Sequence, residues 1–390
     1  MAMATEASVE ELDLSAPPCL HVISAFLFIE PPDVVISFAR DFDRGLISDR
    51  VQHFIWEHCI NRTDAKAYSP YVRGFLKRLI FEIESSGEVV IDELYEKYVY
   101  YMSMKDDVSA KEKARFSKTI SFIFPRECSD LPSCPKSRKL EVLLHCSVNL
   151  LEGDTGCSIW PSSLFLSEFV LSFPELFTNK SCFEVGSGVG LVGICLARIK
   201  ASKVILSDGD LSTLANMRLN LESNKITASN DFLEHTVDSN TVQCLHLPWE
   251  SAAENGLQQI NPDIVLGADV IYDPLCLPHL VQVLAILLNR EGLQAGDSRN
   301  DGCLGKSTRK SDDQNGTYLH DGLPRSPPVA YIASVVRNIT TFNCFLALAS
   351  EANLSVLDIT ERAKPFSLLP YAKSYQPSSI KLLCISYLPK

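Results

Sequence analysis

The chain has 390 residues, of which 46% are hydrophobic and 22% charged, and its 36 basic and 48 acidic residues give a net charge of −12. This length predicts about two folded domains, and the hydrophobic share argues against a disordered chain. The acidic balance disfavours direct binding to nucleic acid, because proteins bind phosphate backbones mainly through Lys and Arg.

The cysteines and the N-terminus argue against disulfides, metals and membranes. The 13 cysteines are scattered singly and include no CxxC pair, so we predict neither a disulfide framework nor a metal site. The N-terminus lacks the basic region of a signal peptide, and the apolar run from Leu20 to Ile29 is too short to cross a bilayer. We expect a cytoplasmic protein without membrane contacts, and a monomer by default.

The first part of the chain reads as helical. Between Ser69 and Ile83, apolar residues recur at steps of three and four, and Pro70 suits the first turn of a helix. The segments Ser48 to Ile60 and Asp92 to Met104 show a similar pattern. We therefore predict a helical N-terminal domain over residues 1–135.

Two segments lack periodicity. From Ala110 to Leu131 the sequence becomes basic and less periodic, which indicates a linker or a docking surface. Residues 295–328 are rich in Gly, Ser, Asp and Lys and poor in apolar residues. Because such a segment buries too little apolar area to offset its ordering entropy, we predict a disordered insertion without a catalytic role.

After about residue 140, short apolar runs rich in β-branched residues alternate with helical stretches. This alternation predicts a layered α/β domain with a largely parallel sheet over residues 136–390. The runs that we expect to form its seven strands are Ser181–Val185, Lys203–Ser207, Thr241–Leu245, Asp263–Ala268, Val329–Val335, Ser355–Thr360 and Ile380–Tyr387.

A glycine loop follows the first of these strands. Gly186, Gly188 and Gly190 stand between the strand and an apolar helix, and Glu184 lies two positions before the first glycine. Glycines allow positive φ and let a ligand approach the main chain. The GxGxG spacing differs from the GxGxxG of dinucleotide sites, and a nearby carboxylate favours a cationic ligand over a phosphate.

Asp208 ends the second strand, where an acidic residue commonly holds the hydroxyls of a ribose. The loop, Glu184 and Asp208 together suit S-adenosylmethionine, which combines a sulfonium cation with a ribose and has no phosphate. A nicotinamide or flavin site is one alternative. A turn of glycines beside a surface aspartate is another.

A further acidic motif, Asp269-Val-Ile-Tyr272, follows the fourth strand. Ligands of open α/β sheets lie beyond the carboxyl ends of the strands, so we expect Asp269 across from the glycine loop. Asp269 would there accept a hydrogen bond from a ligand, and the ring face of Tyr272 could contact a cationic group. The alternative is an aspartate that caps a helix and a tyrosine that packs in the core.

With these motifs the chain resembles the seven-strand methyltransferases, and among them the protein lysine methyltransferases that carry a DxxY motif. The helical N-terminal region and Asp33–Phe42 are most similar to the lysine methyltransferases of elongation factor 2, which are known as the 'family with sequence similarity 86' type. The resemblance covers about residues 140 to 390 and rests on Thr155–Pro161, Phe183–Gly190, Leu206–Asp210, Leu247–Glu250 and Ala268–Pro274.

The resemblance implies a Rossmann-like domain with protein-lysine N-methyltransferase activity, elongation factor 2 as its protein substrate, and an N-terminal domain that recognises this substrate. It assigns catalysis to Asp269 and Tyr272 at the acceptor lysine. Because a lysine amine is mostly protonated at neutral pH, Asp269 suits an acceptor that orients the amine better than a strong base, and Tyr272 would form the wall of the channel and contact the cationic product. Pro248 stands where relatives often carry an acidic residue, so Glu250 is an alternative contact on the adenine side. The contacts with S-adenosylmethionine that the resemblance implies fall on Trp160, Glu184, Gly186, Gly188, Gly190, Asp208, Trp249 and Ala268.

Two rival functions remain open. The first keeps the methyl transfer but changes the acceptor to another protein lysine or a small amine. The second is a non-catalytic adaptor that binds the cofactor only for stability. The presence of Glu184, the glycines, Asp208 and the DxxY motif argues against the adaptor, because a decayed site should have lost some of them.

Overall fold

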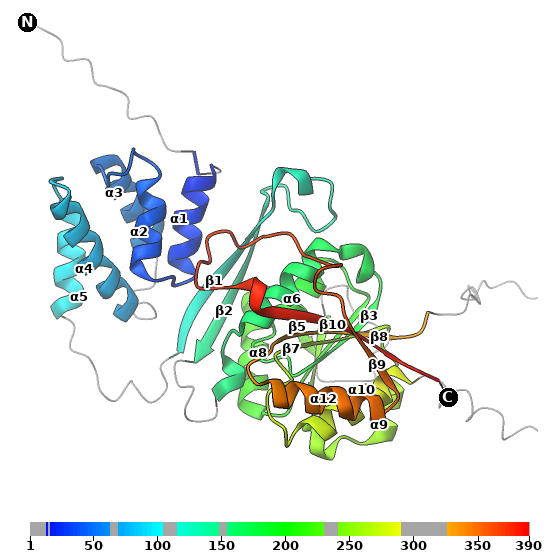
Figure 1. The fold of residues 1–390 in the computed structure, drawn as a ribbon. Coiled ribbons are helices and arrows are strands. Elements are labelled where there is room, and N and C mark those ends of the chain that lie inside the picture. The colour runs from blue at the N-terminus through cyan, green and yellow to red at the C-terminus, as the bar shows by residue number, and fades with distance from the viewer. Residues whose placement is uncertain are drawn as a thin grey trace, which may run out of the picture.

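The computed structural model describes residues 13–62 except residue 15, and residues 69–103, 115–147, 154–229, 241–289 and 326–389. All but the last three residues of the predicted insertion at 295–328 lie outside these ranges. Figure 1 shows a group of helices, a two-stranded hairpin and a layered α/β unit. Among the described residues, no helix has the length and apolar character that a bilayer crossing requires.

The N-terminal helices pack around aromatic side chains. The rings of Phe26 and Phe75 meet edge to face with centroids 5.0 Å apart, and both side chains are fully buried. The three helices predicted from periodicity are confirmed, and the one that ends at Ile55 continues as a π-helical turn to Ile60. The helices of this region are α1 (Pro17–Leu27), α2 (Pro32–Arg40), α3 (Asp49–Ile55), α4 (Ser69–Ser85) and α5 (Asp92–Ser103).

The α/β unit contains an eight-stranded sheet in the order β5-β6-β4-β3-β7-β8-β10-β9. Along this order, each pair of adjacent strands from β5 to β8 is parallel, whereas β10 is antiparallel to both β8 and β9. All seven predicted strands are confirmed, and the eighth, β5, has only three residues, too few to show a periodicity. The strands are β3 (Ser181–Val185), β4 (Lys203–Asp208), β5 (Thr227–Ser229), β6 (Thr241–His246), β7 (Ile264–Ala268), β8 (Val329–Val335), β9 (Leu354–Asp358) and β10 (Ile380–Tyr387).

Helices cover both faces of this sheet. Successive residues of a strand point to opposite faces, so Cys182 joins one apolar core and Phe183 the other. The core around Cys182 includes α6 (Pro161–Ser172), α7 (Leu191–Arg198) and α8 (Leu211–Ser223), and the core around Phe183 includes α9 (Glu254–Ile260), α10 (Leu277–Leu288) and α12 (Ile339–Glu351). The result is the Rossmann-like α/β fold that the sequence predicts.

A hairpin lies where the sequence indicates a linker or docking surface. Strands β1 (Arg115–Ile123) and β2 (Lys139–Ser147) are antiparallel, and the predicted domain boundary at residue 135 falls in their connection. The alternation that marks β1 is hidden because Lys118 occupies an inward position, where its ammonium group lies 4.9 Å from the ring centre of Phe28. This contact is a cation–π interaction, and it lets a basic residue face an apolar core.

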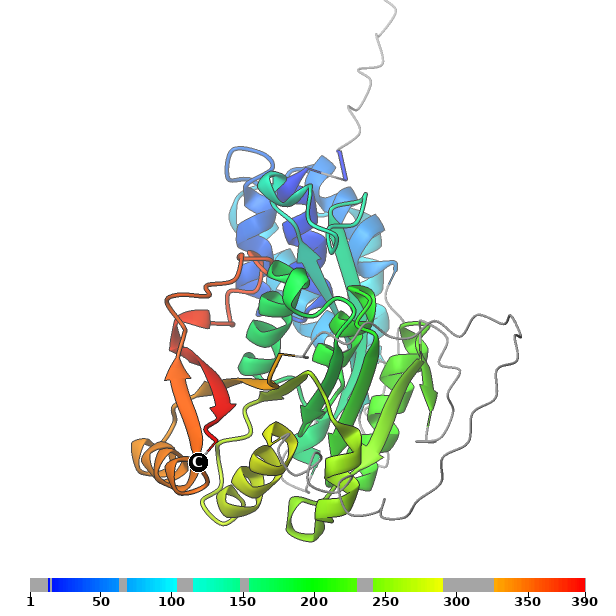
Figure 2. The same ribbon diagram turned by 90° about the vertical axis from the view of Figure 1, so that its right-hand side faces the viewer.

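The segment between β9 and β10 reaches the N-terminal helices, as both views show (Figures 1 and 2). The backbone N–H of Ser374 donates to the buried carboxylate of Glu30 at 3.1 Å, and the hydroxyl of Ser374 donates to it as well. The hydroxyl of Tyr371 accepts from the N–H of Ser121 in β1 at 2.7 Å. These contacts connect the N-terminal helices, the hairpin and the sheet.

A row of asparagines on α8 takes the place of a strand beside β2. Asn216 and Asn220 lie on α8 and Asn224 immediately follows it, and because the three recur every four residues they lie on one side of the helix. The N–H of Leu143 donates to Asn224 Oδ1 at 3.1 Å, and the N–H of His145 donates to Asn220 Oδ1 at 2.7 Å. The side-chain amides of Asn224 and Asn216 donate to the carbonyls of Leu143 and His145 at 2.7 and 2.9 Å. The row thus provides hydrogen-bond partners for the backbone N–H and carbonyl groups at the outer edge of the hairpin.

We predict that Asn220→Ala lowers the free energy of unfolding by about 1–3 kcal/mol, because it leaves the N–H of His145 and the carbonyl of Val189 without their partner. Chemical denaturation of the variant and the wild type measures this difference. Asn61 is exposed, and Asn61→Ala serves as the matched control with an expected change below about 0.5 kcal/mol. Equal stability of the two variants would contradict the role of the row.

Candidate functional site

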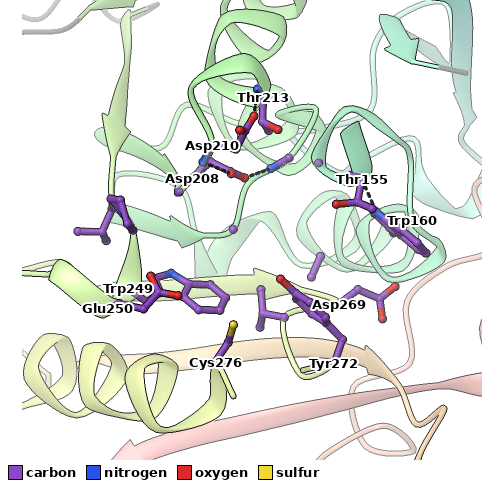
Figure 3. A pocket seen from close by; sticks show the side chains of 18 of the residues that line it. Thr155, Trp160, Asp208, Asp210, Thr213, Trp249, Glu250, Asp269, Tyr272 and Cys276 are labelled. Atoms are coloured by element: carbon purple, nitrogen blue, oxygen red, sulfur yellow. Dashed lines mark hydrogen bonds between the residues drawn. The ribbon is translucent and has the colours of Figure 1, made fainter. Parts of the chain in front are cut away.

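A pocket of about 530 Å³ opens at the carboxyl edge of the parallel strands. Figure 3 shows Asp208 and Asp210 on one side of it, with Trp249, Tyr272 and Asp269 opposite. Parallel strands end at one edge of a sheet, which is why loops far apart in the sequence meet here. The lining includes Thr155, Trp160, Gly186, Gly188, Asp208, Asp210, Trp249, Glu250, Ala268, Asp269, Tyr272 and Arg337.

Two of the predicted glycines line the pocket with their backbone. Gly186 and Gly188 have φ values of 62° and 53°, which other residues rarely adopt. A Cβ atom on Gly188 would lie 3.0 Å from the carbonyl oxygen of Gly156, and one on Gly186 would lie 3.0 Å from Val270. The loop is therefore packed too closely for a side chain, and the main chain itself forms the surface of the pocket.

Two predicted contact residues lie beneath this loop rather than in the lining. Gly190 immediately precedes α7, and a Cβ atom there would point into the core, 2.9 Å from Met217. Glu184 is only 2% exposed, and one of its carboxyl oxygens has no hydrogen-bond partner. Burial raises the pKa of Glu184 to about 8. Both residues support the loop from the protein interior.

Asp208 lies at the end of β4 and is fixed by the main chain around it. Its Oδ2 accepts from the N–H of Gly188 at 3.0 Å, and its Oδ1 accepts from the N–H of Asp210 at 3.1 Å. A carboxylate can accept about four hydrogen bonds, so Asp208 keeps capacity for a ligand. Burial raises the pKa of Asp208.

Asp210, which the sequence interpretation missed as a lining residue, caps helix α8. Its carboxylate accepts from the hydroxyl of Ser212 at 2.6 Å and from the N–H of Thr213 at 2.7 Å, and these bonds lower the pKa of Asp210. Its position immediately before the helix is typical of an N-cap aspartate.

Asp269 follows β7 in a left-handed conformation, with a φ of 57°. Its N–H donates to the carbonyl of Ala333 at 2.9 Å, and its Oδ1 accepts from the N–H of Val335 at 3.2 Å. The residue thereby continues the hydrogen-bond ladder between β7 and β8. It does not cap a helix in the structure, so that alternative is wrong.

Arg337, which the sequence interpretation also missed, pairs with Asp269. Its Nη1 and Nη2 donate to Oδ1 and Oδ2 of Asp269 at 3.1 and 3.2 Å, and its guanidinium carbon lies 5.3 Å from the ring centre of Trp160. The indole N–H of Trp160 donates to the carbonyl of Thr155 at 3.0 Å. One feature of the sequence could have identified Arg337 as a site residue. It comes two residues after the predicted strand Val329–Val335, and ligands bind beyond the carboxyl ends of such strands.

Tyr272 and the charges of the lining complete the site. The side chain of Tyr272 is exposed rather than packed in the core, and its ring lies along the pocket (Figure 3). The lining carries four carboxylates, those of Asp208, Asp210, Glu250 and Asp269, and one cation, Arg337, which is already paired. Such a lining favours a cationic ligand.

Comparisons with known proteins give a consistent result. Residues 141–300 match the model of a family described as lysine methyltransferase. An uncharacterised protein of Dictyostelium discoideum is 33% identical over 56% of this chain and 56% of its own length. The protein-lysine N-methyltransferase EEF2KMT is 31% identical in Homo sapiens, over 55% of this chain and 59% of that protein, and 25% identical in Bos taurus, over 83% and 82%. The chain thus spans less than two thirds of the length of the first two relatives.

We predict that Glu184→Gln changes the pH dependence of stability in the ligand-free protein. The folded pKa of about 8 lies above the ordinary value of 4.5, so the folded state keeps its proton while the unfolded state loses it, and wild-type stability falls as pH rises between these values. The variant has no such proton to lose. Its free energy of unfolding should exceed that of the wild type by on the order of 2–5 kcal/mol at about pH 8.5, and by much less at about pH 4.5.

Calorimetric unfolding at the two pH values measures this effect. Glu175 is exposed, and Glu175→Gln is the matched control, expected to follow the wild type at both. Identical pH slopes for Glu184→Gln and the wild type would show that Glu184 does not keep a proton in the folded state.

Proposed function

We propose that this chain, which belongs to the lysine methyltransferase family, is an S-adenosylmethionine-dependent protein-lysine N-methyltransferase. The observation that carries the proposal is one acidic pocket that joins the glycine loop and Asp208 to Asp269 and Tyr272. The names of the human and bovine relatives support the same activity.

The residues on the cofactor side fit S-adenosylmethionine, which supplies an activated methyl group on a sulfonium cation. The pocket volume of about 530 Å³ suits a small ligand. Asp208 would accept hydrogen bonds from the ribose hydroxyls, and Trp249 offers a flat wall beside Gly186 for the adenine. Trp160 and Ala268 line the same pocket, where they would contact the methionine part, whereas Glu184 and Gly190 would act by holding the loop in shape.

The residues on the acceptor side fit a lysine amine. Asp269 is 8% exposed but lines the pocket, so its carboxylate is shielded from bulk water and can still accept a hydrogen bond from the amine. The ring face of Tyr272 would contact the methylated, cationic product. The contribution of the protein to the rate is mainly to hold the amine in line with the methyl group.

Elongation factor 2 is the substrate that we propose, with the cytoplasm as the place of reaction and a monomer as the active form. The sequence resemblance and the relatives named EEF2KMT support this substrate. Helices α1 to α5 would recognise the folded substrate, because they form a separate surface beside the catalytic unit (Figure 1). Another protein lysine or a small amine is the alternative acceptor.

We predict that Asp208→Ala lowers the affinity for S-adenosylmethionine by about 10- to 100-fold, because the ribose loses a charged acceptor. Isothermal titration calorimetry with the purified protein measures the dissociation constant. Asp269→Asn is the comparison variant, and its affinity should stay within a few-fold of the wild type. Equal losses in both variants would make Asp269 a cofactor residue, and no loss in Asp208→Ala would contradict the ribose assignment.

We predict that Asp269→Asn reduces methyl transfer at least about 100-fold, because a neutral amide orients the amine less well than a carboxylate. The first assay uses radiolabelled S-adenosylmethionine and purified elongation factor 2. A second assay replaces elongation factor 2 with a cell extract that lacks this enzyme. Asp130→Asn is the matched control, because Asp130 is exposed and is not among the lining residues.

The labelling pattern decides between the candidate functions. A band at elongation factor 2 that Asp269→Asn lacks would support the full proposal. A different protein band would keep the activity and replace the substrate. Cofactor binding without any label would favour the non-catalytic adaptor.

A further inference from the structure

The contacts of Asp269 leave one defined position for a further hydrogen-bond donor. Its Oδ1 accepts from both the N–H of Val335 and Nη1 of Arg337, whereas its Oδ2 accepts from Nη2 of Arg337 alone. Because a carboxylate oxygen accepts two hydrogen bonds, Oδ1 is saturated and Oδ2 retains one place. An incoming amine therefore meets one available acceptor position on Asp269.

The charge of Asp269 raises a second question, because a carboxylate beside an amine favours the ammonium form, which has no lone pair to accept a methyl group. The other carboxylates around the pocket favour the ammonium form as well. The carboxylates are Asp208 at the end of β4, Asp210 after it, Glu250 after β6 and Asp273 after β7. Glu184 beneath the loop, Tyr272 and Cys276 carry no charge near neutral pH, because burial raises the pKa of each of them. Among the lining residues, the guanidinium of Arg337 is the one positive charge that opposes the carboxylates.

We infer that Arg337 is a positioning residue for methyl transfer, which orients Asp269 toward the acceptor amine and offsets its charge so that the amine loses its proton near neutral pH. The inference rests on the proposed function. The amine releases a proton to water, and its lone pair then forms the N–C bond. The C–S bond breaks in the same step, and its electron pair stays on sulfur as a neutral thioether.

The structure explains why an arginine suits this role. The planar fork of Arg337 contacts both oxygens of Asp269 while its face lies over Trp160, although the Arg337 side chain is 44% exposed. A lysine carries the same charge but has a single ammonium group, so it cannot form the paired bonds and the stacking at once. Orientation and charge can therefore be separated by two substitutions.

The test compares the pH dependence of kcat/KM for the wild type, Arg337→Gln and Arg337→Lys on purified elongation factor 2 or on the protein that the extract assay labels. Removing the charge in Arg337→Gln should move the rising limb of the profile upward by about one pH unit. Its activity should fall about tenfold near pH 7 and approach the wild type at high pH. Arg337→Lys should keep the position of the limb but reach a lower plateau, because the charge remains and the fork is lost.

Controls separate this role from a structural one. Arg362 is exposed and absent from the pocket lining, so Arg362→Gln removes the same charge and should leave the profile unchanged. Cofactor affinity and the unfolding temperature of both Arg337 variants should stay close to those of the wild type. If Arg337→Gln does not fold, the pH profile of Arg337→Lys tests the inference alone. A rising limb that is shifted by one pH unit in Arg337→Lys would overturn the inference.

The remaining outcomes are also decisive. An equal loss of activity at every pH would overturn the effect on the amine proton and leave Arg337 as a brace for Asp269. An unchanged profile in Arg337→Gln would overturn the inference as a whole. If the wild type methylates no protein at all, the proposed function fails and the inference fails with it, a result distinct from a variant that behaves like an active wild type.

Discussion

The parallel pairing of β4, β3, β7 and β8 determines where the pocket forms. Their loops meet because the paired strands end at one edge, although Asp208, Asp269 and Arg337 are far apart in the sequence. Asp269 extends the pairing beyond the last residue of β7, since its N–H bonds to Ala333 and its carboxylate to Val335, two residues further along β8. A shift of one residue between these strands would direct alternate side chains to the opposite face and separate Asp269 from Arg337. The geometry of the acceptor side thus follows from strand register.

The features that the sequence predicts correctly are local ones. Strands and helices of sufficient length show a periodic pattern of apolar residues in the sequence. The glycine loop and Asp208 follow their strands at short spacings that are typical of such motifs. Arg337 could not be found in this way, because its contact with Asp269 spans 68 residues and depends on the pairing of β7 with β8. Strand β1 was missed for a different reason, since the inward Lys118 breaks the alternation that identifies a strand. The positions of Glu184 and Gly190 beneath the loop depend on tertiary packing around α7, which spacing does not reveal.

Polar contacts join the N-terminal helices, the hairpin and the sheet. The asparagines of α8 bond to the backbone of β2, and Asn220 also donates to the carbonyl of Val189 in the glycine loop at 3.0 Å. The hairpin and the pocket are therefore braced by the same helix. A truncation at residue 135 would remove β1 and uncover the buried Tyr371, which bonds to Ser121. Any contribution of the helices to substrate recognition is better examined in the complete chain.

The bond between Glu30 and Ser374 also has a consequence for biosynthesis. The two residues are 344 positions apart, and a ribosome that adds about 5–20 residues per second needs roughly 17–70 s to reach the second after the first. During this interval the carboxylate of Glu30 lacks the hydrogen bonds that it accepts from Ser374 in the finished protein. The helices at the start of the chain therefore reach their final packing only after the last part has been synthesised.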